Sequence, residues 1–198
     1  MNRRKFFESL ALGAGGSLFA SSGYALRFYP NPSKTKWAVI YGTRYGSNRD
    51  AAIWISEGMG ALADVFDARE NPDLAAFDSL IIGSGIYYNR IAQPLESLIK
   101  NNVALISKKL RAVFVVSGGG ESMGYASKYL DQLASLCQAN PPMKKAFPGR
   151  MTRRLLSAED LKGLEEFYKN SKRPFEDYDQ VKRIDFLKFG EEILKQVT

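Results

Sequence analysis

Runs of uninterrupted apolar residues alternate along this chain with segments whose apolar residues recur every three or four positions. The runs predict buried strands, and the helical spacing predicts amphipathic helices that pack on them. We expect strands at residues 37–41, 63–67, 79–83, 112–117 and 146–151, the last at a sheet edge because of Pro148. We expect helices at residues 48–62, 91–101, 122–138 and 157–169, a last helix capped by Asp185, a helical turn at 73–78 and a polar loop at 172–179. This alternation predicts an α/β fold whose parallel sheet is covered by helices on both faces.

The first 25 residues have the pattern of a targeting segment rather than of a folded domain. Arg3 and Arg4 precede a modest apolar stretch at residues 9–20, and small residues follow at 23–25. This pattern resembles a twin-arginine export signal, which carries folded proteins across the bacterial inner membrane. It predicts a signal at residues 1–25, a linker at 26–35, a folded domain at 36–198 and a periplasmic location. The alternative is an uncleaved N-terminal segment that anchors the protein to a membrane.

The composition limits the chemistry that the side chains can perform. The chain has no histidine and a single cysteine, so imidazole metal sites, Ser-His-Asp catalysis and internal disulfides are excluded. Cys137 lies at helical spacing among apolar residues, and we expect it to fill space in the core. We therefore expect no metal and no catalytic side chain, and a cofactor that supplies the chemistry.

The charge of the chain bears on its partners. The formal net charge is +7, but Lys and Arg are spread among Asp and Glu rather than gathered into a stripe. Nucleic-acid binding is therefore not expected. A basic surface favours an acidic redox partner or anionic lipid headgroups, so peripheral membrane association through the signal or this surface is a further expectation.

Three loops follow predicted strands at the end where parallel strands place a ligand crevice. They comprise residues 42–48, 84–89 and 118–125, and all three are rich in glycine, serine and aromatic residues. Because the loops were placed by the strand pattern alone, their shared composition is independent support for a ligand site at this edge.

The first loop has the residues of a phosphate site. Gly42 and Gly46 permit tight backbone turns, while Thr43, Ser47 and Asn48 add side-chain donors before the positive end of a helix. No Gly-Lys-Ser/Thr follows the loop and no Gly-x-Gly-x-x-Gly is present, so nucleoside triphosphate and dinucleotide fingerprints are absent. The loop therefore predicts a monophosphate ligand, with a plain strand-to-helix turn as the alternative.

The sequence Gly-Thr-Arg-Tyr-Gly-Ser-Asn at residues 42–48 resembles the FMN phosphate loop of flavodoxins, whose pattern is Thr/Ser-x-Thr-Gly-x-Thr. Tyr45 stands where that pattern has its middle threonine. Within the superfamily the chain is most similar to the flavodoxin-like protoporphyrinogen oxidases, whose loop reads Ser-Thr-Arg-Asp-Gly-Gln-Thr-Arg. The similarity continues through residues 77–87 and, weakly, 184–193, so it spans most of residues 36–195.

This resemblance implies a flavodoxin-like three-layer sandwich with a five-stranded parallel sheet of order 2-1-3-4-5, and an FMN cofactor. It implies that the phosphate is bound by Thr43, Arg44, Tyr45, Gly46, Ser47 and Asn48. The flavin ring is expected between one group comprising Ser84, Gly85, Ile86, Tyr87 and Tyr88, and another comprising Gly118, Gly119, Gly120 and Tyr125. The alternatives are that Tyr87 and Tyr88 pack on the domain and that Tyr125 begins the next helix beside Tyr129.

The function implied is electron transfer through FMN in the periplasm, with a redox partner protein or a quinone. One alternative is a flavin-dependent, quinone-linked oxidase of the protoporphyrinogen oxidase type, and another is a flavin-free accessory module on the same fold. Two features depart from these relatives. The chain is basic where soluble flavodoxins are acidic, and its basic span at 144–157 is short where the oxidases carry a long basic insertion.

Overall fold

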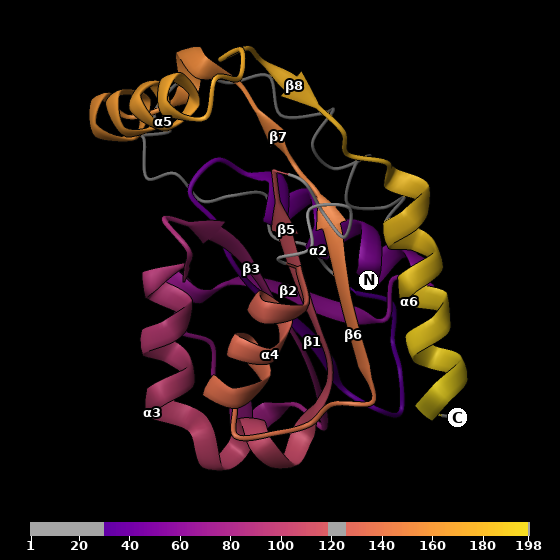
Figure 1. The fold of residues 1–198 in the computed structure, drawn as a ribbon. Helices are drawn as coiled ribbons and strands as arrows, with labels where there is room; N and C mark the ends of the chain where they lie inside the picture. The colour runs from indigo at the N-terminus through magenta and orange to yellow at the C-terminus, as the bar shows by residue number, and fades with distance from the viewer. Residues whose placement is uncertain (1–29, 119–125, 198) are drawn as a thin grey trace, which may run out of the picture.

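A computed structural model describes residues 30–118 and 126–197 of the chain. Its centre is a parallel sheet of order β2-β1-β3-β5-β6 (Figure 1). The strands are β1 (Trp37–Gly42), β2 (Ala63–Asp67), β3 (Ser79–Tyr87), β5 (Leu110–Ser117) and β6 (Met143–Pro148). A short β4 (Arg90–Ile91) pairs antiparallel with the end of β3. The predicted α/β class and the order of the five parallel strands are confirmed, and β6 with Pro148 is an edge strand as expected.

Helices cover both faces of this sheet (Figure 1). One layer contains α3 (Gln93–Lys109) and α4 (Ala126–Leu136), and the other contains α2 (Ser47–Gly58) and α6 (Arg183–Val197). Short 3-10 turns, η1 (Ala68–Glu70) and η2 (Leu74–Ala76), connect β2 to β3. The second of these is the helical turn that the sequence predicts at 73–78. None of the described helices is both long and apolar enough to cross a membrane.

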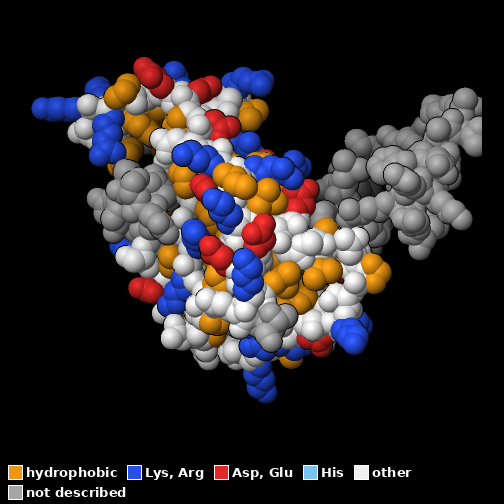
Figure 2. Space-filling view, turned by 90° about the vertical axis from the view of Figure 1, so that its right-hand side faces the viewer, with side chains coloured by type: hydrophobic (Ala, Val, Ile, Leu, Met, Phe, Trp, Pro, Cys, Tyr) orange, Lys and Arg blue, Asp and Glu red, His pale blue; other side chains and the backbone are white. Residues whose placement is uncertain are grey.

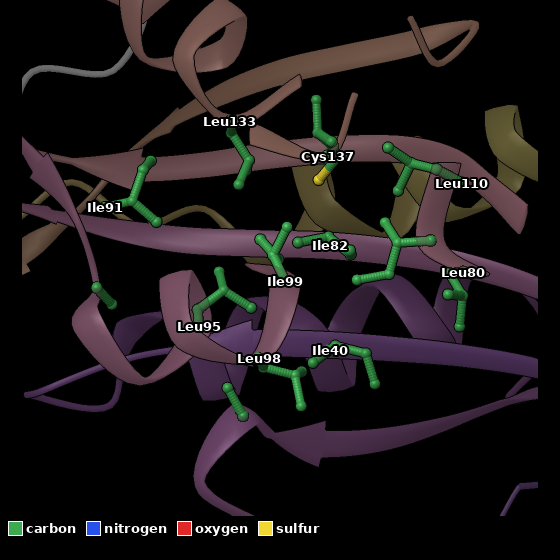
Figure 3. Packing of buried hydrophobic residues seen from close by; sticks show 14 of the residues in the cluster. Ile40, Leu80, Ile82, Ile91, Leu95, Leu98, Ile99, Leu110, Leu133 and Cys137 are labelled. Atoms are coloured by element: carbon green, nitrogen blue, oxygen red, sulfur yellow. The ribbon is translucent and has the colours of Figure 1, made fainter. Parts of the chain in front are cut away.

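Each strand divides its side chains between two apolar cores. Along β1, Ile40 joins the core beneath α3 and α4, while its neighbour Val39 joins the core beneath α2 and α6. Both residues are fully buried, which explains why the strands are apolar without alternation. Cys137 is also fully buried, among the leucine and isoleucine side chains of the first core (Figure 3), and burial raises the pKa of its thiol to about 12. The expectation that Cys137 fills the core is confirmed.

Several element boundaries differ from the prediction for local reasons. Helix α2 ends at Gly58 rather than at residue 62, because the chain reverses through left-handed conformations at Gly60 and Ala61. Helix α3 starts two residues late, since Ile91 lies in β4, and it continues to Lys109 through a kink at Asn102. The Asn102 amide donates a hydrogen bond to the carbonyl of Leu98 at the kink. Helix α6 starts at Arg183, so Asp185 lies in its first turn.

The largest addition to the sandwich is the β6–α6 connection, which comprises residues 149–182. The predicted strand at 146–151 is divided at Gly149, whose N–H donates to the carbonyl of Ser117. The connection then forms β7 (Arg150–Met151), η4 (Arg153–Leu155), α5 (Ala158–Asn170) and β8 (Tyr178–Asp179). Strand β8 pairs antiparallel with β7, so the region predicted as a polar loop at 172–179 contains a strand. Helix α5 lies beyond the carboxyl ends of the sheet strands (Figure 1) and protrudes from the body in Figure 2.

Candidate functional site

The site lies where β1, β3 and β5 end side by side. Gly42 is in register with Ser84, and Gly85 is in register with Val116, so the loops after these strands leave the same edge of the sheet. The structure thus brings the first two predicted loops together. In the third loop only Gly118 is described. It lies close to the β6–α6 connection, because a Cβ at this position would lie 2.7 Å from the hydroxyl of Tyr178. The predicted site residues Gly119, Gly120 and Tyr125 lie outside the described residues.

The first loop turns sharply into α2 at Gly46. Gly46 has a φ of 91°, which favours glycine, and its N–H donates to the side-chain oxygen of Thr43 at 3.0 Å. Gly46 precedes α2 as its N-cap, so no side chain caps the helix. The N–H groups of Ser47 and Asn48 therefore remain without intrahelical partners, at the positive end of the helix. This is the geometry of a backbone anion site.

Asn48 adds a buried amide to this helix terminus. The residue is only 1 % exposed, and its Oδ1 has no hydrogen-bond partner among the described residues. A buried amide end without a partner is costly unless a ligand or water satisfies it. Because a half-turn of the side chain exchanges the carbonyl and NH₂ ends, Asn48 can offer either an acceptor or a donor to that ligand.

Arg44 and Tyr45, which precede Gly46 in the first loop, contact the start of α5. The Nη1 of Arg44 donates to both carboxylate oxygens of Asp160 at 2.9 Å, and the hydroxyl of Tyr45 donates to Asp160 Oδ2. The Tyr45 hydroxyl also accepts a hydrogen bond from the N–H of Ser157 at 3.3 Å. Burial acts to raise the pKa of Asp160, but hydrogen bonds with Tyr45, Tyr88 and Arg44 outweigh it and hold that pKa below its ordinary value. The carboxylate is therefore charged when it holds the loop.

The second loop folds back over the first. Tyr87 accepts a hydrogen bond from the N–H of Arg44 at 2.8 Å, and the Arg44 guanidinium lies 4.8 Å from the centre of its ring. The ring also covers Gly85, where a Cβ would lie 2.6 Å from the Tyr87 hydroxyl. Tyr88 is 55 % exposed, and its hydroxyl lies against Gly163 of α5. Both tyrosines thus lie at the loop cluster, with Tyr87 bound to the first loop and Tyr88 next to α5.

Two other residues of the second loop serve the scaffold. The hydroxyl of Ser84 is buried, donates to the carbonyl of Gly85 and accepts from the N–H of Ala92. Ile86 pairs with Ile91 in β4 and packs against the core beneath α3. Among the described predicted residues, Ser84 and Ile86 therefore support the loop rather than presenting a free polar group at its surface.

Asp160 is the site residue that the sequence reasoning missed. Its Ser-x-x-Asp pattern with Ser157 predicts a helix start, and the Ser157 Oγ does accept from the N–H of Asp160 at 3.1 Å. The carboxylate itself turns to the first loop, and Tyr45 takes the N–H of Ser157 that a capping carboxylate would accept. No local sequence signal marks this contact, because its partners are more than a hundred residues apart. The described residues contain no cluster of three metal-ligating side chains.

Comparisons with known proteins agree with this architecture. In solved structures, the chain is similar to a flavodoxin from the domain Archaea, with a TM-score of 0.51, 16 % identity, and coverage of 82 % of this chain and 98 % of the other. It is also similar to flavodoxin 1 from Bacillus cereus, with a TM-score of 0.50, 15 % identity, and coverage of 83 % of this chain and 100 % of the other. No curated protein matches the sequence. The family model of the flavodoxin domain matches residues 38–177, more than two thirds of the chain, which therefore belongs to the flavodoxin domain family.

Proposed function

We propose that this protein binds FMN at the carboxyl edge of its sheet and transfers electrons through it. The observation that carries the proposal is the uncapped start of α2 beside the buried amide of Asn48, whose Oδ1 has no partner among the described residues. In a flavodoxin domain this is a place for a phosphate, and the donor set fits one. The lack of histidine and the burial of Cys137 leave the cofactor to supply the redox chemistry.

The residues would divide the work between the two ends of the cofactor. Thr43, Ser47 and Asn48 would hold the phosphate with hydroxyl, amide and backbone donors, and Arg44 would add positive charge. Tyr87 and Tyr88 would cover the ring and exclude water from it, and the sequence resemblance alone assigns Gly119, Gly120 and Tyr125 to the same end of the cofactor. When bound, FMN accepts and donates one or two electrons. The protein orients the cofactor and tunes its environment, and none of the described side chains is required to act as an acid or base.

The direct test is the visible flavin absorbance of protein purified after cytoplasmic expression, together with titration of stripped protein with FMN and riboflavin. Wild-type protein should bind FMN more tightly, because riboflavin lacks the phosphate. The double substitution S47A/N48A should weaken FMN binding more than riboflavin binding. Colourless protein that neither ligand stabilises against heat would reject the flavin, and equal losses for both ligands would place the phosphate elsewhere.

A quinone-linked oxidase is the second candidate, and the β6–α6 connection favours it. A protruding helix beside the cofactor edge, with Phe167 exposed on α5 and Leu155 exposed in η4, is a feature that a pure carrier does not need. If the protein is such an oxidase, it should turn over a reduced substrate in the steady state with a quinone as acceptor. A carrier should instead exchange electrons rapidly with a protein partner. Porphyrinogen is the first substrate to test, given the sequence resemblance.

The location and partners complete the proposal. The twin-arginine pattern at residues 1–25 supports export of the folded, cofactor-loaded protein to the periplasm. There the partner would be a redox protein or a quinone, with the basic surface favouring peripheral membrane association. A fusion of residues 1–35 to a reporter that functions only after folded export should move to the periplasm, and R3K/R4K should retain it in the cytoplasm. Equal export of both fusions would reject this route.

A further inference from the structure

Asp160 differs from the other residues of α5 in its burial. It is the only buried residue of that helix, with 5 % of its surface exposed. Its carboxylate is bound by Arg44 and Tyr45 of the first loop and by Tyr88 of the second, not by other side chains of α5. Burying an ionised group without such partners is strongly unfavourable, so these hydrogen bonds tie Asp160 to the loops.

The contact fixes Arg44 on two sides. Its Nη1 is bound to both oxygens of Asp160, and its Cζ lies over the ring of Tyr87. The side chain is nevertheless 48 % exposed, so without these contacts it would sample many rotamers. Among the described residues, none accepts a hydrogen bond from the Nε or Nη2 of Arg44. The arginine is thus held in place while most of its donors remain available to an anion.

Tyr45 gives the same contact a second point of attachment. Its hydroxyl donates to Asp160 and accepts from the N–H of Ser157, so it completes the start of α5. This explains why a tyrosine stands where the flavodoxin pattern has threonine. A threonine hydroxyl is too close to the backbone to make these contacts, whereas a phenol reaches across to α5.

We propose that Asp160 is a positioning residue that fixes Arg44 beside the phosphate site and so raises the preference for FMN over riboflavin. The inference rests on the proposed function and deepens it. An arginine that is already ordered loses little conformational freedom when the phosphate binds, so more of its interaction appears as affinity. Asp160 itself carries a negative charge that repels phosphate, and the experiment must therefore separate positioning from charge.

The experiment measures FMN and riboflavin affinities of stripped full-length protein, for wild type and for D160N. The matched control is E159Q, which removes the same charge from the exposed residue that precedes Asp160. D160N should lower the ratio of FMN to riboflavin affinity about three- to tenfold, the scale of one side chain that must be immobilised on binding. E159Q should leave the ratio unchanged or raise it slightly. In an R44Q background, D160N should have no further effect on the ratio.

Three results would overturn the inference: an unchanged ratio in D160N, a raised ratio, or the same loss in the presence and absence of Arg44. A wild-type protein that binds both ligands equally, or neither, would instead reject the proposed function. If D160N fails to fold, Y45F serves as the second variant, because it removes the hydroxyl that anchors Asp160 but keeps the ring. It should also lower the ratio, and an unchanged ratio in Y45F would count against the inference.

Trypsin cleavage of the connection provides a further readout. In wild type, FMN should slow the cleavage more than riboflavin does, whereas in D160N the two ligands should slow it to the same extent.

Discussion

The sheet body and the β6–α6 connection are held together by different forces. In the body, both faces of the strands pack apolar side chains, and residues such as Phe114 and Ile82 are fully buried. In the connection, α5 has one buried residue, and that residue is a carboxylate. Apolar burial depends little on pH, salt or ligand, whereas an ionic contact depends on all three. The body is therefore expected to be stable under most conditions, and the attachment of α5 to be conditional.

The largest expected difference is in the accessibility of a thiol placed in each region. Cys137 should react with a thiol reagent only when the body unfolds, because it is fully buried and its thiol pKa is about 12. F167C would place a thiol at a position of α5 that is 56 % exposed. With an ordinary stability of about 5–15 kcal/mol, the two labelling rates should differ by at least about 1000-fold. Fast labelling of both thiols would show that the body opens as readily as the connection.

The second prediction compares two phenylalanines by their effect on stability. F114A should lower the free energy of unfolding by about 3–5 kcal/mol, because it leaves a cavity in the core beneath α2 and α6. F167A should change it by less than about 0.5 kcal/mol, because its ring is largely in solvent. Urea denaturation followed by circular dichroism measures both. A large loss in F167A would show that the apolar face of α5 is packed.

The sequence was informative about the body for the same reason that the body is stable. Strands buried on both faces need uninterrupted apolar residues, and such runs marked the central strands β1, β3 and β5 and their shared edge. The edge strand β6 contains Lys144 and Lys145, and the sequence predicts it three residues too late. Element ends were less predictable, because they depend on single contacts such as the amide of Asn102 with the carbonyl of Leu98.

The candidate site divides in the same way. Gly46 and Asn48 could be placed from sequence, since a strand, a glycine turn and a helix start are neighbours along the chain. The partnership of Arg44 and Tyr45 with Asp160 could not, because only the tertiary fold brings residues 44–45 and 160 together. A polar contact between distant residues leaves no periodic pattern in the sequence.

The third prediction concerns acid. When α5 is attached, the pKa of Asp160 is lower than its ordinary value near 4, so at a pH above that ordinary value the contact stabilises the attachment fully. This stabilisation is lost as the pH falls through the lowered pKa and the carboxylate becomes protonated. Hydrogen exchange of the α5 amides, corrected for the intrinsic effect of pH, should therefore accelerate in acid before the amides of β3 do. D160N should exchange fast in α5 at every pH, and retention of the acid step in D160N would assign it to another carboxylate.

The smallest effect is expected from an ion pair that belongs to the body but lies on its surface. Glu96 and Lys100 form an i,i+4 pair on α3 at 2.6 Å, with the Lys100 side chain 61 % exposed. E96Q removes a carboxylate just as D160N does, but solvent screens the pair and water replaces the lost partner. The free energy of unfolding should fall by no more than about 0.5 kcal/mol, and the exchange of α5 should be unchanged. If E96Q accelerated the exchange of α5 as much as D160N does, the attachment of α5 would not depend on the buried position of Asp160.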